Sequence, residues 1–284
     1  MTRYVLLGLL FSSLLVAQKH SISELPGAKK DPECGSTVAI KVGFVADTSA
    51  TDDIKAAAAN ILGNAQHFAI VGTGFVVSQD GYVVTANHVV VAAQQRITTL
   101  NLLKFVKGSG GIFFAAPRVE SGPIQFTGTT IGYDYDIVGQ DAINDLALLK
   151  MHAPPKVKVE ELLKENLVTP AKISQANAEP GTNVSTCGFP FAIPEAALTS
   201  GKIASYTLSA KDALVNSIPG ETKVQLVDLR ISGGNRGGAI ISQNRTVVGV
   251  VDAYVSAPQF AGIAVMIPAS AVRELLVKYG ANAQ

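Results

Sequence analysis

Residues 228–240 read DLRISGGNRGGAI and place four glycines around one large side chain. Gly233 and Gly234 precede Asn235, and Gly237 and Gly238 follow Arg236. Glycines at this density predict a tight turn, with Arg236 at its tip. Because apolar residues flank the segment on both sides, the turn is expected to join two buried strands. The rest of the sequence must decide which residues this turn faces.

The composition is that of a globular protein. Of the 284 residues, 48% are hydrophobic and 16% are charged, which excludes a disordered chain. The 23 Lys and Arg residues balance the 22 Asp and Glu residues, with a formal net charge of +1. This balance gives no case for nucleic acid or an anionic membrane surface as a partner. No group of residues has metal-ligand spacing, so neither a metal nor a cofactor is expected.

The N-terminus has the pattern of a secretory signal peptide. Arg3 precedes an apolar run from Tyr4 to Val16, which is short for a membrane span and ends in polar residues. The sequence therefore predicts a signal peptide at 1–18 and an extended arm at 19–35. The protein is expected to be secreted or periplasmic, without membrane association after cleavage. An uncleaved anchor is the alternative.

Two cysteines, Cys34 and Cys187, would lie in an oxidising compartment. A disulfide between the arm and a later strand stays open at this point, because two thiols so far apart in sequence carry no framework signal.

The first half of the chain reads mainly as strands. Residues 36–45 predict a first strand, and 51–63 predict a short surface helix capped by Thr51. Residues 69–77 and 82–86 form a predicted hairpin that leads directly into His88. A buried strand at 145–150 begins with an acid, Asp145. Residues 100–140 suggest a long hairpin excursion whose role stays open.

The second half follows a linker around Pro154 and Pro155 and is again rich in short strands. Strands are predicted at 183–187, 198–206, 223–227, 239–242, 247–251 and 263–267. A helix is predicted from Pro268 to Gly280, with Val272, Leu275, Leu276 and Tyr279 on one face. Short strands with Gly-rich turns indicate an all-β fold of antiparallel barrels or a sandwich.

Three parts of the sequence together suggest acyl-transfer chemistry. That chemistry needs a hydroxyl beside an imidazole, an acid that orients the imidazole, and backbone N–H groups that hold an oxyanion. His88, Asp145 and the Gly-rich turn occur in one of the known chain orders for such a site.

These segments resemble the trypsin-like serine proteases, and especially the secreted bacterial type similar to the HtrA/Deg proteases. The resemblance covers roughly 36–277 and implies two antiparallel Greek-key β-barrels of the chymotrypsin/trypsin type, at 36–157 and 158–284, with a C-terminal helix. Five segments carry it in order: 72–75 with 83–90, 144–150, 181–191, 199–203 and 262–268.

The resemblance implies that His88 is the general base and Asp145 its orienting acid. Gly234, Asn235 and Gly237 correspond to the oxyanion turn, and Arg236 stands in the place of the nucleophilic serine. A guanidinium is permanently protonated and offers no lone pair, so Arg236 cannot attack a carbonyl. Two nearby hydroxyls, Ser232 and Ser242, would reach His88 only if the turn were rebuilt.

Two further departures from the family pattern bear on the site. The interval between His88 and Asp145 is 145 − 88 = 57 residues, which is longer than the resemblance implies. Asp134, Asp136 and Asp141 therefore compete as the orienting acid, and we prefer Asp145 because it heads an apolar strand. The chain stops soon after the closing helix, so a PDZ module is not expected.

We therefore expect an inactive pseudoprotease that binds peptide or protein. A second interpretation makes Arg236 and the turn N–H groups a receptor for a carboxylate, such as a peptide C-terminus. A third is an active serine endopeptidase of the HtrA/Deg type, through a substitute hydroxyl or because this copy is a variant. Residual activity, peptide preference and oligomeric state stay open.

Overall fold

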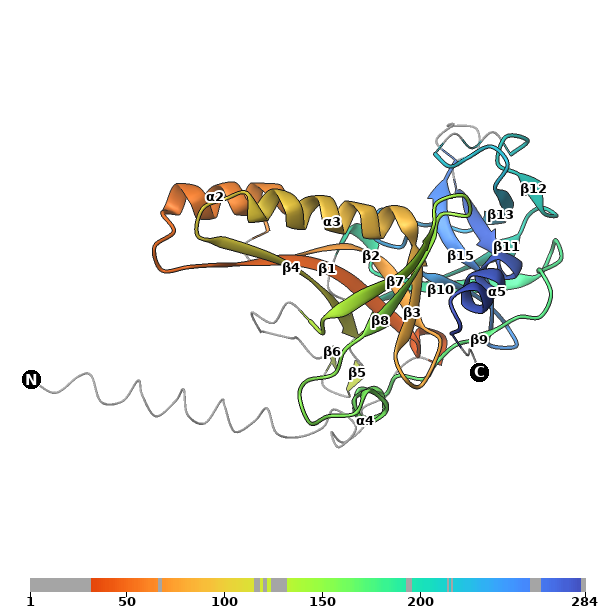
Figure 1. The fold of residues 1–284 in the computed structure, drawn as a ribbon. Coiled ribbons are helices and arrows are strands. Elements are labelled where there is room, and N and C mark those ends of the chain that lie inside the picture. Colours follow the sequence, from red (N-terminus) through yellow and green to blue (C-terminus); the bar gives the residue numbers. More distant parts are fainter. Residues whose placement is uncertain are drawn as a thin grey trace, which may run out of the picture.

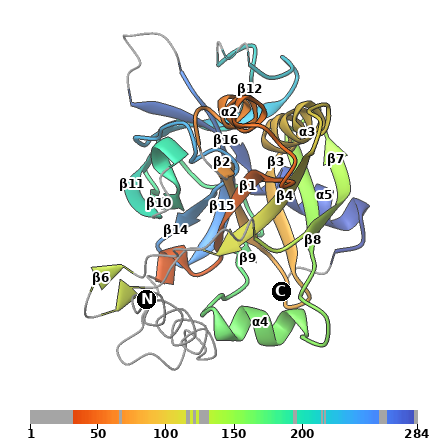
Figure 2. The ribbon, with the colours of Figure 1, turned by 90° about the vertical axis from the view of Figure 1, so that its left-hand side faces the viewer.

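A computed structural model describes residues 32–65, 68–114, 118–119, 122–123, 132–192, 196–213, 215, 217–255 and 262–281. Two antiparallel β-sheets dominate it and lie beside each other (Figures 1 and 2). The predicted signal peptide, most of the arm and His67 fall outside the described residues. No helix in the described part of the chain is long and apolar enough to cross a membrane.

The first sheet has six strands in the order β4-β1-β2-β3-β8-β7. Its interior is apolar, with Val38, Ile40 and Val83 fully buried. The predicted first strand, hairpin and Asp-headed strand all occur in it. Its strands are β1 (Thr37–Ala46), β2 (Phe68–Val76), β3 (Tyr82–Ala86), β4 (Val106–Phe114), β7 (Tyr135–Asp141) and β8 (Leu146–Met151).

The second sheet closes on itself. Its main strands follow the order β11-β10-β14-β15-β16-β13, and the first strand, β11, also pairs with the last, β13. Each of its six main strands overlaps a predicted one. They are β10 (Asn183–Gly188), β11 (Ala197–Ile203), β13 (Lys223–Asp228), β14 (Ala239–Ser242), β15 (Thr246–Tyr254) and β16 (Ile263–Pro268). Two short strands, β9 (Lys172–Ile173) and β12 (Leu208–Ser209), extend it. Two barrel-like sheets were the predicted fold class, which is confirmed.

Two predicted helices also occur. In α2 (Asp52–Ile61), the Thr51 side chain accepts a hydrogen bond from the backbone N–H of Ile54, as an N-cap residue does. In α5 (Ala269–Lys278), Val272, Leu275 and Leu276 are buried against the second sheet. The remaining short elements are η3 (Pro32–Cys34), α4 (Val159–Glu165), η4 (Pro190–Ala192), β5 (Arg118–Val119) and β6 (Gly122–Pro123).

The structure contains a helix after His88 that was not predicted from the sequence. Residues 87–101 form a helix, α3 (Asn87–Asn101), and the predicted excursion over 100–140 contains the end of α3, β4, β5, β6 and most of β7. The sequence hid this helix because its β-branched residues have low helix propensity. Tertiary packing holds it instead, since Val89, Val90 and Ala93 are buried. In Figure 1, α3 and α2 lie along one side of the β1–β4 ribbon.

The two halves are joined by a shared core and by one covalent bond. Phe75 and Leu148 of the first sheet belong to the same hydrophobic cluster as Val250 and Leu275 of the second half. A disulfide connects Cys34 in η3 to Cys187 in β10, with a Cα–Cα distance of 5.2 Å. This answers the question that the sequence left open.

Candidate active site

His88 lies in the first turn of α3, immediately after β3. Ala86 occupies the N-cap position and has no polar side chain with which to cap the helix. Asp145 fills this role instead. Its backbone carbonyl accepts from the N–H of Asn87 at 2.9 Å, and its Oδ1 accepts from the N–H of His88 at 2.9 Å. One residue of a distant loop therefore fixes the backbone at His88.

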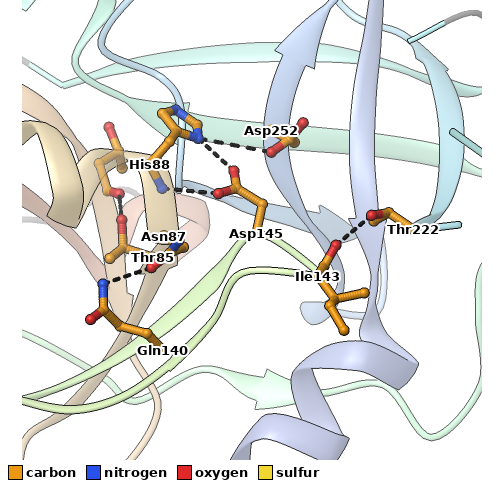
Figure 3. Close-up of polar contacts among 9 residues, drawn as sticks. Thr85, Asn87, His88, Gln140, Ile143, Asp145, Thr222 and Asp252 are labelled. Carbon is orange, nitrogen blue, oxygen red and sulfur yellow. Dashed lines mark hydrogen bonds and ion pairs between the residues drawn. The ribbon is translucent and has the colours of Figure 1, made fainter. Parts of the chain in front are cut away.

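Asp145 also contacts the imidazole of His88, with 2.5 Å between Oδ2 and Nδ1 (Figure 3). The acid lies just before β8, with a φ of 49° in the left-handed region, which Asp tolerates better than most residues. Burial alone would raise the pKa of Asp145, but its interactions with the His88 side chain, with Asp252 and with the His88 backbone outweigh burial and lower it. This carboxylate is thus held ionised beside the imidazole.

The three competing acids, which the structure also describes, lie in other contacts. Asp141 accepts hydrogen bonds from the backbone of Ile143 and from Asn144. Asp136 pairs with the exposed His152, with 2.9 Å between Oδ2 and Nε2. The carbonyl of Asp134 accepts from the N–H of His152 at 2.8 Å. The structure therefore brings Asp145 to His88, as preferred from the sequence.

The Gly-rich turn of the second half rests on the hairpin of the first half. The backbone N–H of Thr73 in β2 donates to the carbonyl of Arg236 at 2.8 Å, and the Thr73 hydroxyl donates to the carbonyl of Gly234 at 2.6 Å. Gly237 has a φ of 83°, and a Cβ atom there would collide with the Thr73 carbonyl and the Thr85 hydroxyl. Glycine is required at this position, which the sequence pattern indicated.

The turn presents unused hydrogen-bond donors. The backbone N–H groups of Gly234 and Arg236 donate to no acceptor within the described residues. The Nε atom of Arg236 is buried and likewise has no acceptor in this part of the chain. The Arg236 guanidinium lies 5.5 Å from the centroid of the Tyr254 ring. A cationic side chain and a turn with free N–H groups are therefore adjacent to each other.

Sequence reasoning missed a third polar residue of the site, Asp252. It is 1% exposed and lies in β15, at a bulge where Val251 pairs with Met266 but Ala253 pairs with Val265. A bulge re-aims a side chain, and Asp252 Oδ1 lies 4.0 Å from His88 Nδ1 (Figure 3). Burial and the neighbouring Asp145 raise the pKa of Asp252 to about 9, although Arg236 acts in the opposite direction. An acid inside a buried apolar strand was the signal available in the sequence.

The two hydroxyls considered as substitutes are bound elsewhere. The Ser232 hydroxyl lies 3.1 Å from Oδ1 of Asn235, and the Ser242 hydroxyl lies 3.0 Å from that of Thr246. The site thus combines an oriented imidazole, a turn with two backbone N–H groups that are free among the described residues, and a guanidinium.

Comparison with known proteins identifies the framework. The sequence model of the trypsin-like peptidase domain matches residues 72–250. The chain is 28% identical over 213 residues to a probable periplasmic serine endoprotease DegP-like of Brucella suis, covering 74% of this chain and 33% of that protein. It is 30% identical over 208 residues to serine protease HTRA1B of Danio rerio, covering 73% and 34% respectively. The chain thus spans about a third of the length of these curated relatives.

Solved structures show the same fold. The HtrA-type protease AlgW with a decapeptide superposes with a TM-score of 0.55 at 16% identity, covering 92% of this chain and 66% of that one. An inactive mutant form of Rv3671c from M. tuberculosis gives a TM-score of 0.51 at 21% identity, covering 88% and 89%. From the family match and these relatives together, the chain belongs to the trypsin-like peptidase domain family and is a domain similar to those of HtrA/DegP proteases.

Proposed function

We propose that this protein is a catalytically inactive member of its family, a pseudoprotease, which acts by binding a peptide or protein. The observation that carries the proposal is Arg236, which occupies the tip of the turn where the family places its nucleophilic serine. Acyl transfer needs a lone pair on the attacking atom, and a guanidinium has none to offer.

The rest of the framework supports binding. His88 and Asp145 are hydrogen-bonded to each other, and the Gly234–Gly238 turn is hydrogen-bonded to Thr73 of β2. A binding surface built for extended peptides does not require the nucleophile, because recognition precedes the attack. AlgW, one of the structural relatives, was solved with a decapeptide. The secreted or periplasmic location stays part of the proposal and agrees with the periplasmic DegP-like relatives.

The decisive experiment is the reversion Arg236→Ser. We expect the unaltered chain to hydrolyse no denatured casein, and the variant to gain at least about 100-fold over the background rate. The matched control is the double variant Arg236→Ser with His88→Ala, which should lose the gained activity. Hydrolysis by the unaltered protein that persists in His88→Ala would contradict both the site and the proposed inactivity.

A serine-directed phosphonate probe tests the alternative, an active endopeptidase that uses another hydroxyl. Covalent labelling of the unaltered chain would favour that alternative, and mass spectrometry would locate the modified residue. We expect no labelling of the unaltered chain, and labelling at residue 236 in the Arg236→Ser variant.

The free donors at the turn suggest how a ligand is held. The N–H groups of Gly234 and Arg236 and the guanidinium form a donor set suited to a carboxylate. Calorimetry with one peptide, bearing either a free or an amidated C-terminus, tests this interpretation. Preference for the free carboxylate that disappears in Arg236→Gln would support it, and equal affinity for both peptides would end it.

A further inference from the structure

Three side chains around Nδ1 of His88 are of the types that bind metal ions. His88, Asp145 and Asp252 each offer one ligand atom, and these atoms lie within 4.8 Å of one another. The three residues come from α3, the loop before β8, and β15, so no local spacing in the sequence could reveal them. Figure 3 shows both acids directed at the same edge of the imidazole.

Asp252 is the observation that points to a ligand. Its side chain is 1% exposed, and neither carboxylate oxygen receives a hydrogen bond from a donor within the described residues. In its protonated form Asp252 can donate to the neighbouring Asp145, but in its ionised form it has no donor in that part of the chain. The charge of Arg236 lowers the pKa of Asp252, but no ion pair joins these two residues within 4.0 Å. A buried carboxylate without a donor is strongly unfavourable, unless a cation or a proton satisfies it.

We propose that His88 Nδ1, Asp145 Oδ2 and Asp252 form a binding site for one divalent transition-metal ion of the Zn²⁺ class. One imidazole and two carboxylates are a donor set that Zn²⁺ and its neighbours accept. With a neutral imidazole, the ligands carry two negative charges, which match the charge of the ion.

The observed geometry lies within reach of coordination. Ligand atoms at about 2.1 Å from a tetrahedral ion are separated by about 3.4 Å from each other. His88 Nδ1 lies 2.5 Å from Asp145 and 4.0 Å from Asp252, so one contact must open and the other must close, each by less than about 1 Å. The second oxygen of Asp145 already accepts from the His88 N–H, which holds that ligand in place.

A bound ion would change the role of His88. Its Nδ1 would coordinate the ion instead of contacting Asp145, which fixes the ring and removes the partner that the family uses to orient the base. The site would thus convert catalytic machinery into a structural or sensing centre. This inference does not depend on peptide binding or on the absence of hydrolysis.

The test uses the whole chain after treatment with a chelator. Titration with Zn²⁺ by calorimetry should show one saturable site, and Co²⁺ should give visible absorption bands typical of a tetrahedral nitrogen and oxygen site. Asp252→Asn should weaken Zn²⁺ binding by at least about 100-fold. Zn²⁺ should raise the melting temperature of the unaltered chain and leave that of Asp252→Asn unchanged.

The chain offers a matched control in its second His–Asp pair. Asp136→Asn removes the acid that contacts exposed His152 and should leave Zn²⁺ affinity unchanged. No saturable binding of either ion would overturn the proposal, and so would Zn²⁺ binding that survives Asp252→Asn or is lost in Asp136→Asn. If Asp252→Asn fails to fold, the Co²⁺ spectrum of the unaltered chain decides instead. None of these readouts requires peptide or hydrolysis, so the pseudoprotease proposal can fail while this one stands.

Discussion

The two halves of the site differ in how well their polar groups are satisfied. The first half supplies His88 and Asp145, which share two hydrogen bonds, while the backbone of Asn87 adds a third to the Asp145 carbonyl. Nε2 of His88 is the one buried side-chain atom of this pair without a partner among the described residues. The second half supplies Arg236 and Asp252, of which the buried Nε, Oδ1 and Oδ2 atoms all lack a partner in that part of the chain. The hydrogen-bonded His–Asp pair therefore lies in the first half, and the side chains whose buried polar atoms all lack hydrogen-bond partners among the described residues, Arg236 and Asp252, lie in the second.

This contrast indicates that the backbone contacts that hold the Gly-rich turn do not depend on the side chain at position 236. The turn still sits on Thr73 and still closes the contact between the barrels, although its tip carries a guanidinium. A fold can carry different side chains at its site, because function lies in the site residues and not in the fold itself. Four stability predictions test the contrast; all of them are measured by urea unfolding in the presence of a chelator.

The largest effect is expected where the two halves are covalently joined. The disulfide between Cys34 and Cys187 closes a loop with a sequence separation of 153, so Cys34→Ser with Cys187→Ser should lower the free energy of unfolding by about 4 kcal/mol. Fluorescence probes placed in each half should then report whether the halves unfold together. A loss below about 1 kcal/mol would show that the shared core alone holds them.

The second prediction tests the close contact between the Gly-rich turn and the first half of the chain. Gly237→Ala should cost about 3 kcal/mol, because the new Cβ would meet the backbone of Thr73 and the hydroxyl of Thr85 at a positive φ. Gly63 provides the control, since it has a φ of 69° but nothing within 4 Å of the methyl group that alanine would add. Gly63→Ala should cost about 1 kcal/mol, the backbone contribution alone. Equal costs at both positions would contradict the close contact.

A buried charge in the first half gives a third test. Lys41 is 3% exposed, its ammonium lies over the rings of Phe68 and Phe113, and burial lowers its pKa from 10.5 to about 8. The unfolded chain then binds more protons than the native chain between pH 8 and 10.5, so stability should rise with pH across this window. The rise is at most about 3 kcal/mol. Lys41→Met should abolish it, and a parallel pH profile in that variant would exclude Lys41 as the cause.

The smallest effects compare the two acids of the site directly. Asp145→Asn should cost about 2 kcal/mol, because hydrogen bonds to an ionised carboxylate are lost. Asp252→Asn should instead gain about 1 kcal/mol, because it removes a buried carboxyl group without a donor. Asp136→Asn, at an exposed pair, should change stability by less than about 0.5 kcal/mol. A loss for Asp252→Asn similar to that for Asp145→Asn would erase the contrast between the halves.

Much of the fold could be predicted from local patterns. Strand alternation and the turn at 78–81 placed the hairpin that leads to His88, and the glycines around Arg236 placed the turn. The α3 helix was missed, because its Val-rich start favours a strand and its burial against β1 and β4 is a tertiary effect.

The residues of the candidate site likewise include some that local sequence patterns reveal and one that they do not. His88, Asp145 and the turn could be found because each lies in a recognisable sequence context, and the structure places His88 and Asp145 in contact. Asp252 could not be assigned, since its side chain reaches His88 through a bulge in β15, and a bulge depends on strand pairing that is set by distant residues.

The sequence by itself placed an arginine at the tip of the Gly-rich turn, and a guanidinium offers no lone pair for attack in any surroundings. It also determined the order of strands and turns, which follows from short-range periodicity. Tertiary structure alone decided which of four acids contacts His88, that Cys34 meets Cys187, and that a second buried carboxylate lies beside the imidazole. These are contacts between residues far apart in the chain, and they are fixed by how the two barrels pack rather than by any local pattern.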